Sequence, residues 1–158
     1  MKTVGIDPST STGVAIVGEG EDRGKVIHIE DSTGFSRLGL MAVELDRTLE
    51  IWKPELVIVE AMAIGHHSSV VIVVQCATMV RQVLYNRKQP WFEVPPKTLK
   101  KWTTGNGNAS KDDMAAFVKS RWNFVSSSDD INDAYALAQM GQLGVSALIA
   151  IKGVTLGI

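Results

Sequence analysis

Residues 4–17 read VGIDPSTSTGVAIV, which is two short runs of β-branched residues separated by a polar turn. Such runs, bounded by Pro, Ser and Thr, are typical of strands, here predicted at 2–7 and 12–18. A third run at 25–29 follows the turn GEGEDRG, so this segment predicts an antiparallel meander. Asp7 ends the first strand, and the proline after it cannot donate a hydrogen bond to a sheet. The stretch therefore places a carboxylate at the rim of a sheet.

Beyond this meander, helix and strand patterns alternate. Apolar residues recur every three or four positions over 35–52, which predicts an amphipathic helix. LVIV at 56–59 is a continuous apolar run, typical of a strand buried on both faces. The other predicted elements are a helix at 68–86, a strand at 91–94, a basic helical turn at 97–102, a helix from Ser110 with Asp113 in a capping-box position, and a last helix at 130–148. This order predicts an α/β fold with a mixed five-stranded sheet flanked by helices.

Four carboxylates are expected to meet at one edge of that sheet. Glu60 ends the strand at 56–59, and it lies beside Asp7 if the two strands are parallel neighbours. Asp130 and Asp133 are three residues apart, on the core-facing side of the last helix. Buried carboxylates are costly unless they are paired or bound to metal. Oxygen donors alone favour Mg²⁺ or Mn²⁺, and four carboxylates balance two such ions, which together can hydrolyse a phosphodiester. Turn acids and a helix N-cap cluster are the alternative interpretation.

The charges are distributed unevenly, although the net charge is only −1. Residues 81–121 contain nine basic and three acidic residues, a balance of +6, whereas the rest of the chain carries −7. An acidic region beside a basic one suggests a cation site next to a polyanion site. A solvated surface helix with ordinary charge scatter is the alternative.

Four segments together resemble the successive motifs of one family. VGIDPSTSTGVAIV, VIVEAM, VPPKTLKKWTTGNGNASKDDM and DDINDAYALA resemble, in order, those of RuvC-type Holliday-junction resolvases, over nearly the whole chain. The resemblance implies an RNase H-like fold and a homodimeric, Mg²⁺-dependent endonuclease. Such an enzyme nicks symmetric strands of four-way junctions in recombination, repair or replication. The residues that match the four metal-binding acids of the family are Asp7, Glu60, Asp130 and Asp133.

The basic segment contributes the expected DNA contacts. Lys111 matches the lysine that follows the family's glycine-rich loop, where it lies close to the scissile phosphate, so the resemblance implies a catalytic role for it beside the four acids. Glycines in such a loop let backbone N–H groups approach a phosphate, and lysines before it hold the flanking backbone. The residues expected to bind DNA are Lys97, Lys100, Lys101, Gly105, Asn106, Gly107, Lys111 and Arg81.

One position departs from the family pattern. Many members carry an aromatic residue three positions after the catalytic glutamate, whereas this chain has Ala63 followed by Ile64. Selectivity for four-way junctions is therefore in question, and other branched DNA is included among the expected substrates. His66 and His67 could contact phosphate, assist proton transfer or cap a helix, and no catalytic role is assigned to them.

Two other functions compete with the nuclease. GIDPSTSTG also resembles the phosphate-binding hairpin of actin-like and sugar-kinase phosphotransferases, but that architecture needs two such domains and this length supplies one. A non-catalytic binder of branched DNA would use the same basic segment. Four acids near a phosphate backbone weaken binding unless metal occupies them, which disfavours that alternative.

Length and composition exclude several classes of protein. The 158 residues, 45% of them apolar, predict a single nuclease domain spanning 1–158. The lone Cys76 excludes a disulfide scaffold and a zinc finger. No signal peptide or membrane span is predicted, so a cytoplasmic location is expected. The helix at 68–86 has more apolar surface than one sheet face can cover, which predicts a homodimer built on this helix. Ala77 and Val80 are the candidate interface residues, and the alternative is that they pack only against the sheet of their own protomer. A helicase partner and a cleavage-sequence preference are not indicated.

Overall fold

The computed structural model describes residues 1–20, 22–30, 32–62 and 70–157, and one six-stranded sheet forms its centre. The strands are β1 (Thr3–Asp7), β2 (Thr12–Val17), β3 (Arg23–Ile27), β4 (Leu56–Glu60), β5 (Trp91–Val94) and β6 (Thr155–Gly157). They lie in the order β3-β2-β1-β4-β5-β6. β2 is antiparallel to β1 and β3, whereas β4 is parallel to both β1 and β5. The sheet is therefore mixed, as predicted.

The α/β fold, the antiparallel meander and the five predicted strands are confirmed. The structure adds β6, a three-residue strand that pairs antiparallel with β5. The sequence does not predict this strand because three residues are too few to show strand alternation.

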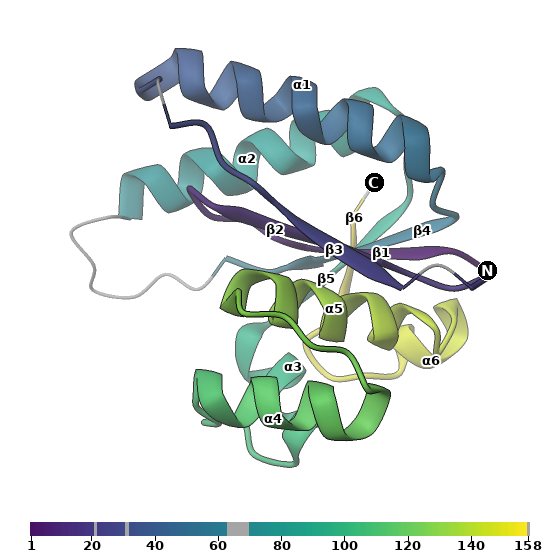
Figure 1. Ribbon diagram of the computed structural model, residues 1–158. Helices are drawn as coiled ribbons and strands as arrows, with labels where there is room; N and C mark the ends of the chain where they lie inside the picture. Colours follow the sequence, from purple (N-terminus) through teal and green to yellow (C-terminus); the bar gives the residue numbers. More distant parts are fainter. Residues whose placement is uncertain (21, 31, 63–69, 158) are drawn as a thin grey trace.

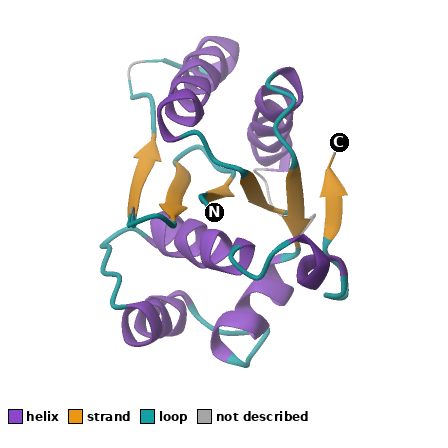
Figure 2. Cartoon of the chain, turned by 90° about the vertical axis from the view of Figure 1, so that its right-hand side faces the viewer, coloured by secondary structure: helices purple, strands orange, loops and turns teal. Residues whose placement is uncertain are grey.

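Helices cover both faces of the sheet (Figure 1). Their bounds are α1 (Gly34–Trp52), α2 (Val70–Asn86), α3 (Pro96–Thr104), α4 (Lys111–Trp122), α5 (Asp129–Gly141) and α6 (Val145–Ile149). α1 and α2 lie on one face, and α5 lies on the other with α3 and α4 beyond it; Figure 2 shows these layers from the side. Each face of the sheet thus has its own apolar core. None of the described helices has both the length and the apolar character needed to cross a membrane.

Glycines in the first two strands let α5 pack directly on the sheet. A Cβ on Gly5 would lie 1.9 Å from the carbonyl oxygen of Ala134, and a Cβ on Gly13 would lie 2.0 Å from that of Asp130. Both distances are far inside van der Waals contact, so only glycine allows this approach. The close packing fixes where the α5 backbone that carries Asp130 lies relative to β2.

The prediction of one last helix over 130–148 is wrong. α5 ends at Gly141, and α6 begins at Val145, after Gly144 with a φ of 81°. A φ in the left-handed region interrupts a helix, and glycine adopts it without a Cβ penalty. Leu148 is still buried, so the apolar surface continues through a second helix rather than along one helix axis.

α2 buries most of its apolar residues within the chain itself. Ala77 and Val80 are only 2% and 0% exposed in the single chain. The expectation that they form a dimer interface is therefore wrong, because a second chain cannot reach them while α2 stays packed. The exposed side of α2 instead carries Val71, Val74 and Tyr85.

Candidate active site

Asp7 and Glu60 stand side by side at one end of the sheet. β1 and β4 are parallel neighbours with Ile6 paired to Val59, and the next residue of each strand is one of these acids. Both carboxylates therefore leave the sheet at the carboxyl ends of adjacent strands, where open α/β sheets form their sites. They line a shared pocket of about 130 Å³, which Ala77 of α2 helps to close.

α5 brings Asp130 and Asp133 to the same end of the sheet. Ser128 is the N-cap of this helix, and its hydroxyl oxygen accepts a hydrogen bond from the N–H of Ile131. The α5 backbone at Asp130 lies over Gly13, and Gly13 pairs with Asp7 across the β1–β2 ladder. The spacing of three residues puts Asp133 on the same helix face. The four acids indicated by the sequence are thus brought together by three elements, β1, β4 and α5.

Burial and mutual repulsion raise the pKa values of these carboxyl groups. Burial, followed by the charges of Asp133 and Asp130, raises the pKa of Asp7 to about 7. Burial, followed by the charges of Asp7 and Asp133, raises the pKa of Glu60 to about 9. Burial also raises the pKa of Asp133 to about 6 and raises that of Asp130. Each of these shifts means that the site disfavours four negative charges unless a cation compensates them.

The donor set suits a hard divalent cation. Carboxylate oxygens are the ligands that Mg²⁺ and Mn²⁺ prefer, and these four come from three packed elements. Within residues 1–62 and 70–157, as far as they are described, no three acidic, histidine or cysteine side chains already form a metal cage. The buried negative charge of the four carboxyl groups favours a cation at this position.

Lys111 begins α4 beside the acids, and a capping box positions it. The Ser110 hydroxyl accepts a hydrogen bond from the N–H of Asp113 at 3.1 Å, and the Asp113 carboxylate accepts one from the N–H of Ser110 at 2.9 Å. The capping box predicted from the sequence is therefore confirmed. Lys111 Nζ lies 3.2 Å from an oxygen of Asp129, and its charge works against the rise in the pKa of Asp7. Lys111 is thus held at the edge of the acidic cluster.

Lys100 is a second lysine close to the acids, and the sequence assigns it only to DNA backbone contacts. It lies on α3, and its charge works against the rise in the pKa of both Glu60 and Asp133. Lys97, Lys100 and Lys101 share one helix face by their spacing. Which of them faces the acids depends on how α3 packs, and no local pattern contains that information.

The loop of residues 105–109 folds back on α3. The side-chain oxygen of Asn106 accepts a hydrogen bond from the N–H of Asn108 at 3.0 Å, which tightens the loop. A Cβ on Gly107 would lie 3.1 Å from the carbonyl oxygen of Lys97, so the loop backbone touches the first turn of the helix. This packing sets the predicted glycine-rich loop beside the predicted lysines.

An open groove of about 620 Å³ leads away from the acids along this loop. It is lined by Ala61 and Met62, which also line the acid pocket, and by Lys97 and Lys100. Every residue that lines it is neutral or basic. A polyanion in the groove would therefore meet positive charge next to the acidic cluster.

Other predicted residues lie elsewhere or outside the described part of the chain. Arg81 donates two hydrogen bonds to the carboxylate of Glu93, at 2.7 and 2.8 Å, and so ties α2 to β5. Because this bidentate pair already neutralises the guanidinium, we leave Arg81 out of the proposed DNA surface, and its expected contact with DNA stays a prediction. Outside the described residues lie Ala63, Ile64, His66 and His67.

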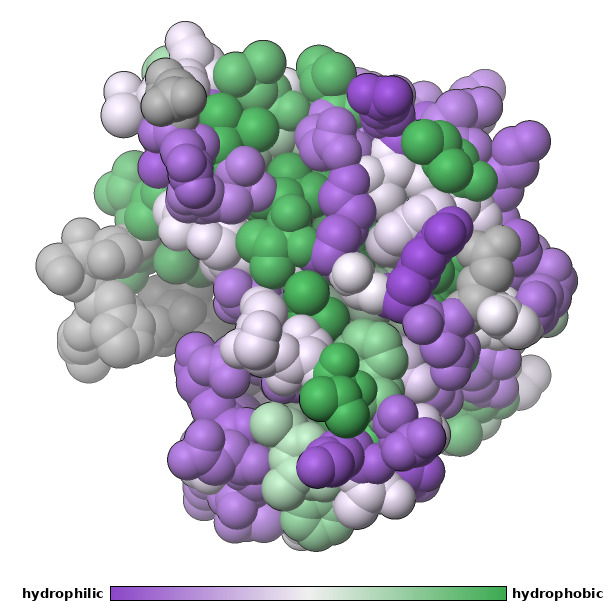
Figure 3. Space-filling view, viewed as in Figure 1, coloured by the Kyte–Doolittle hydropathy of each residue, from purple (hydrophilic) through white to green (hydrophobic). Residues whose placement is uncertain are grey.

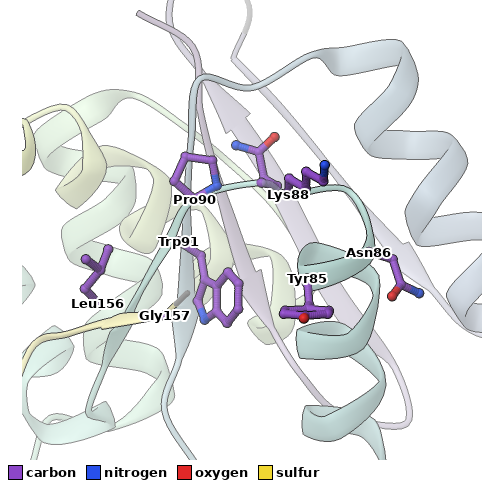
Figure 4. Close-up of a pocket in the computed structure, with 8 residues that line it drawn as sticks. Tyr85, Asn86, Lys88, Pro90, Trp91, Leu156 and Gly157 are labelled. Carbon is purple, nitrogen blue, oxygen red and sulfur yellow. The ribbon is translucent and has the colours of Figure 1, made fainter.

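A separate apolar pocket of about 600 Å³ lies at the amino end of β5 (Figure 4). Tyr85 comes from the end of α2, Trp91 begins β5, and Leu156 belongs to β6. The acids lie at the carboxyl ends of β1 and β4. This pocket is therefore not part of the acidic cluster.

The chain is similar to known proteins both in sequence and in fold. A family model described as "Crossover junction endodeoxyribonuclease RuvC" matches residues 3–140. Proteins of that name from Synechococcus sp. strains WH7803 and CC9902 are 33% and 29% identical over 155 and 150 residues, and both alignments cover 89% of this chain and 97% of the relative. The solved structure "T. thermophilus RuvC in complex with Holliday junction substrate" has a TM-score of 0.76 at 22% identity, covering 90% of this chain and 93% of that chain. This last likeness is one of fold.

Proposed function

The chain belongs to the family of RuvC crossover junction endodeoxyribonucleases, and on that premise we propose that it nicks four-way DNA junctions, and other branched DNA, by metal-dependent phosphodiester hydrolysis. The observation that carries this proposal is the meeting of four carboxylates from β1, β4 and α5 beside two lysines. The solved relative that is bound to a Holliday junction shares the fold on which these residues are placed.

In this proposal Asp7, Glu60, Asp130 and Asp133 hold the divalent cations. When bound, two Mg²⁺ ions, or Mn²⁺ in their place, supply the activated water and the positive charge that phosphodiester hydrolysis requires. Asp7 and Glu60 project from adjacent strands, so their backbone positions are fixed by the sheet. Lys111 sits at the edge of the cluster, where its ammonium group can stabilise charge that develops on the scissile phosphate.

The DNA backbone would follow α3 and the glycine-rich loop. Lys97, Lys100 and Lys101 give this surface its positive charge, and Lys100 is the one nearest the acids by its effect on them. The loop of Gly105, Asn106 and Gly107 offers backbone N–H groups to phosphate oxygens. The surface positions the substrate, and these contacts carry no sequence information.

Two other functions fit less well. A protein that only binds branched DNA gains nothing from a buried acidic cluster, because the carboxylates repel phosphates. A phosphotransferase of the actin or sugar-kinase type is disfavoured by the family match, which spans residues 3–140. We therefore keep the nuclease as the proposed function.

A nicking assay tests this function directly. We expect the purified chain to nick a synthetic four-way junction in Mg²⁺ faster than a linear duplex of the same sequence, and to leave both intact in EDTA. Gel mobility of labelled strands under denaturing conditions measures the cut. Junction binding without any nicking in Mg²⁺ or Mn²⁺ would support the non-catalytic alternative, and hydrolysis of ATP without nicking would support the phosphotransferase.

We also propose that the chain acts as a homodimer through the exposed side of α2. Val71 and Tyr85 are 70% and 64% exposed there, and Val74 lies between them on the same helix face. Apolar side chains gathered on an outer face usually mark an interface. A symmetric dimer would present two acidic clusters to a substrate that has twofold symmetry. Residues 1–158 would act as one nuclease domain in each copy, and the cytoplasmic location stays a prediction.

Substitution of Val74 tests the dimer. We expect Val74→Asp to give a folded monomer, because it places like charges opposite each other across a twofold axis. Sedimentation measures the oligomeric state, and circular dichroism checks the fold. Val43→Asp is the matched control, because Val43 is an exposed valine of α1, whose apolar residues show on the upper side of the molecule in Figure 3. A monomeric parent, or a dimeric Val74→Asp variant, contradicts the proposal.

A further inference from the structure

A second groove, of about 830 Å³, continues the first one across α3. Both grooves are lined by Lys97, Gly107 and Asn108, so they meet along one edge. The first groove in turn shares lining residues with the acid pocket. One continuous depression therefore runs from the acidic cluster to the far side of α3, where Lys101 and Lys152 line it.

The C-terminal segment forms the outer wall of the second groove. β6 is antiparallel to β5, with Thr155 paired to Glu93, so the residues before β6 lie beyond the carboxyl end of β5. This is the end of the sheet at which the acids lie. Gly153 has a φ of 88°, and a Cβ there would lie 3.3 Å from the ring of Pro95, just before α3. The loop that carries Lys152 is thus packed against the start of α3.

The groove is cationic, and its charges are available. Lys97, Lys101 and Lys152 are exposed, and within the described part of the chain none of these ammonium groups has a carboxylate within 4 Å. None of the residues that line the groove is acidic. Trp102 forms part of its floor and is held by stacking on Trp122, with ring centroids 5.7 Å apart. The lining of the groove therefore suits the charge of a polyanion.

We propose that this second groove binds the sugar-phosphate backbone of the DNA arm that leaves the cleavage site, with Lys152 contacting a phosphate opposite Lys101. This inference rests on the proposed function, because the first groove connects the phosphate track to the acids. Lys152 lies beyond residues 3–140, which the family model matches, and it is a contact that neither the sequence motifs nor that match indicates. The C-terminal segment thereby adds to substrate affinity rather than to the chemistry.

Neutralising Lys152 tests the inference. Fluorescence anisotropy of a labelled four-way junction is measured in EDTA between 50 and 300 mM KCl. We expect Lys152→Gln to lower the log–log salt slope by about 0.9 and to weaken binding roughly three- to tenfold at 100 mM KCl, the loss of one phosphate contact. Lys152→Arg keeps the charge and should bind as the parent does.

Lys88→Gln is the matched control. Lys88 is an exposed loop lysine at the amino end of β5, beside the apolar pocket and away from the groove. A folded Lys152→Gln variant with the slope and affinity of Lys88→Gln overturns the inference, as does a variant that loses nicking rate but not affinity. If the parent chain nicks the junction and Lys152→Gln binds it as the parent does, only the proposal that the second groove binds DNA is contradicted. If the Lys152→Gln substitution weakens binding but the parent does not nick, the nuclease function is contradicted and DNA binding by the second groove is supported.

Discussion

Asp7→Asn is expected to lower the rate of junction nicking in Mg²⁺ by about a thousandfold, which corresponds to roughly 4 kcal/mol of transition-state stabilisation. The substitution keeps the shape of the side chain but removes a charge that holds the cation. Junction binding should be unchanged or tighter, because one negative charge near the phosphates is lost. Single-turnover nicking and anisotropy with the same junction measure the two effects separately.

The matched control for this variant is Asp112→Asn. Asp112 is exposed in the first turn of α4, next to Lys111, so its loss changes the net charge by the same amount and in the same region. We expect it to nick at nearly the parental rate. Nicking by Asp7→Asn within tenfold of the parent in Mg²⁺ would exclude Asp7 as a metal ligand.

The acidic cluster is the part of the site that the sequence predicts well, and the reason is geometric. Two strands that each end in an acid bring both acids to the same edge of the sheet when the strands are parallel neighbours. β1 and β4 are such neighbours, with Ile6 paired to Val59. The spacing of Asp130 and Asp133 fixes their common helix face in the same way.

Features that depend on packing between distant segments are not predicted. Lys152 reaches the groove only because β6 pairs with β5, and the sequence gives no sign of that pairing. Lys100 faces the acids because α3 packs beside α5, whereas its neighbours Lys97 and Lys101 look the same in the sequence. Local sequence patterns predict which residues share one face of a helix or strand. Tertiary contacts determine which of these faces pack against each other.

The mistaken dimer interface has the same origin. The valine-rich helix predicts more apolar surface than a sheet can cover, but α1 packs against α2 and covers part of it. Val80 therefore lies in the core, and the apolar side chains of α2 that stay exposed include Val71 and Tyr85. Glycines show a related limit, because Gly5 and Gly13 appear in the sequence only as weak strand residues, although they allow α5 to approach the sheet.

Glu60→Gln is expected to stabilise the metal-free chain, and increasingly so as the pH rises. The folded state raises the pKa of Glu60 from 4.5 to about 9, first through burial and then through the charges of Asp7 and Asp133. Below about pH 4.5 both folded and unfolded states hold the proton, so glutamine and protonated glutamate are nearly equivalent. At higher pH the unfolded chain releases the proton while the folded chain retains it, so the parent loses stability up to about pH 9. The variant avoids this loss in the free energy of unfolding, which is on the order of a few kcal/mol.

Urea unfolding in EDTA at several pH values between 5 and 9 measures the difference in the free energy of unfolding between the variant and the parent. The same measurement with Mg²⁺ tests whether Glu60 binds the cation. Glu30→Gln, which makes the same substitution at an exposed position after β3, is the matched control. Adding Mg²⁺ at pH 8 should stabilise the parent by about 2.7 kcal/mol when its concentration is a hundred times the dissociation constant. Glu60→Gln should gain much less, because one of the four carboxylates that hold the ion is missing. A difference between variant and parent that stays flat with pH, or an equal gain from Mg²⁺ in both proteins, would mean that Glu60 neither carries the buried charge nor binds the cation.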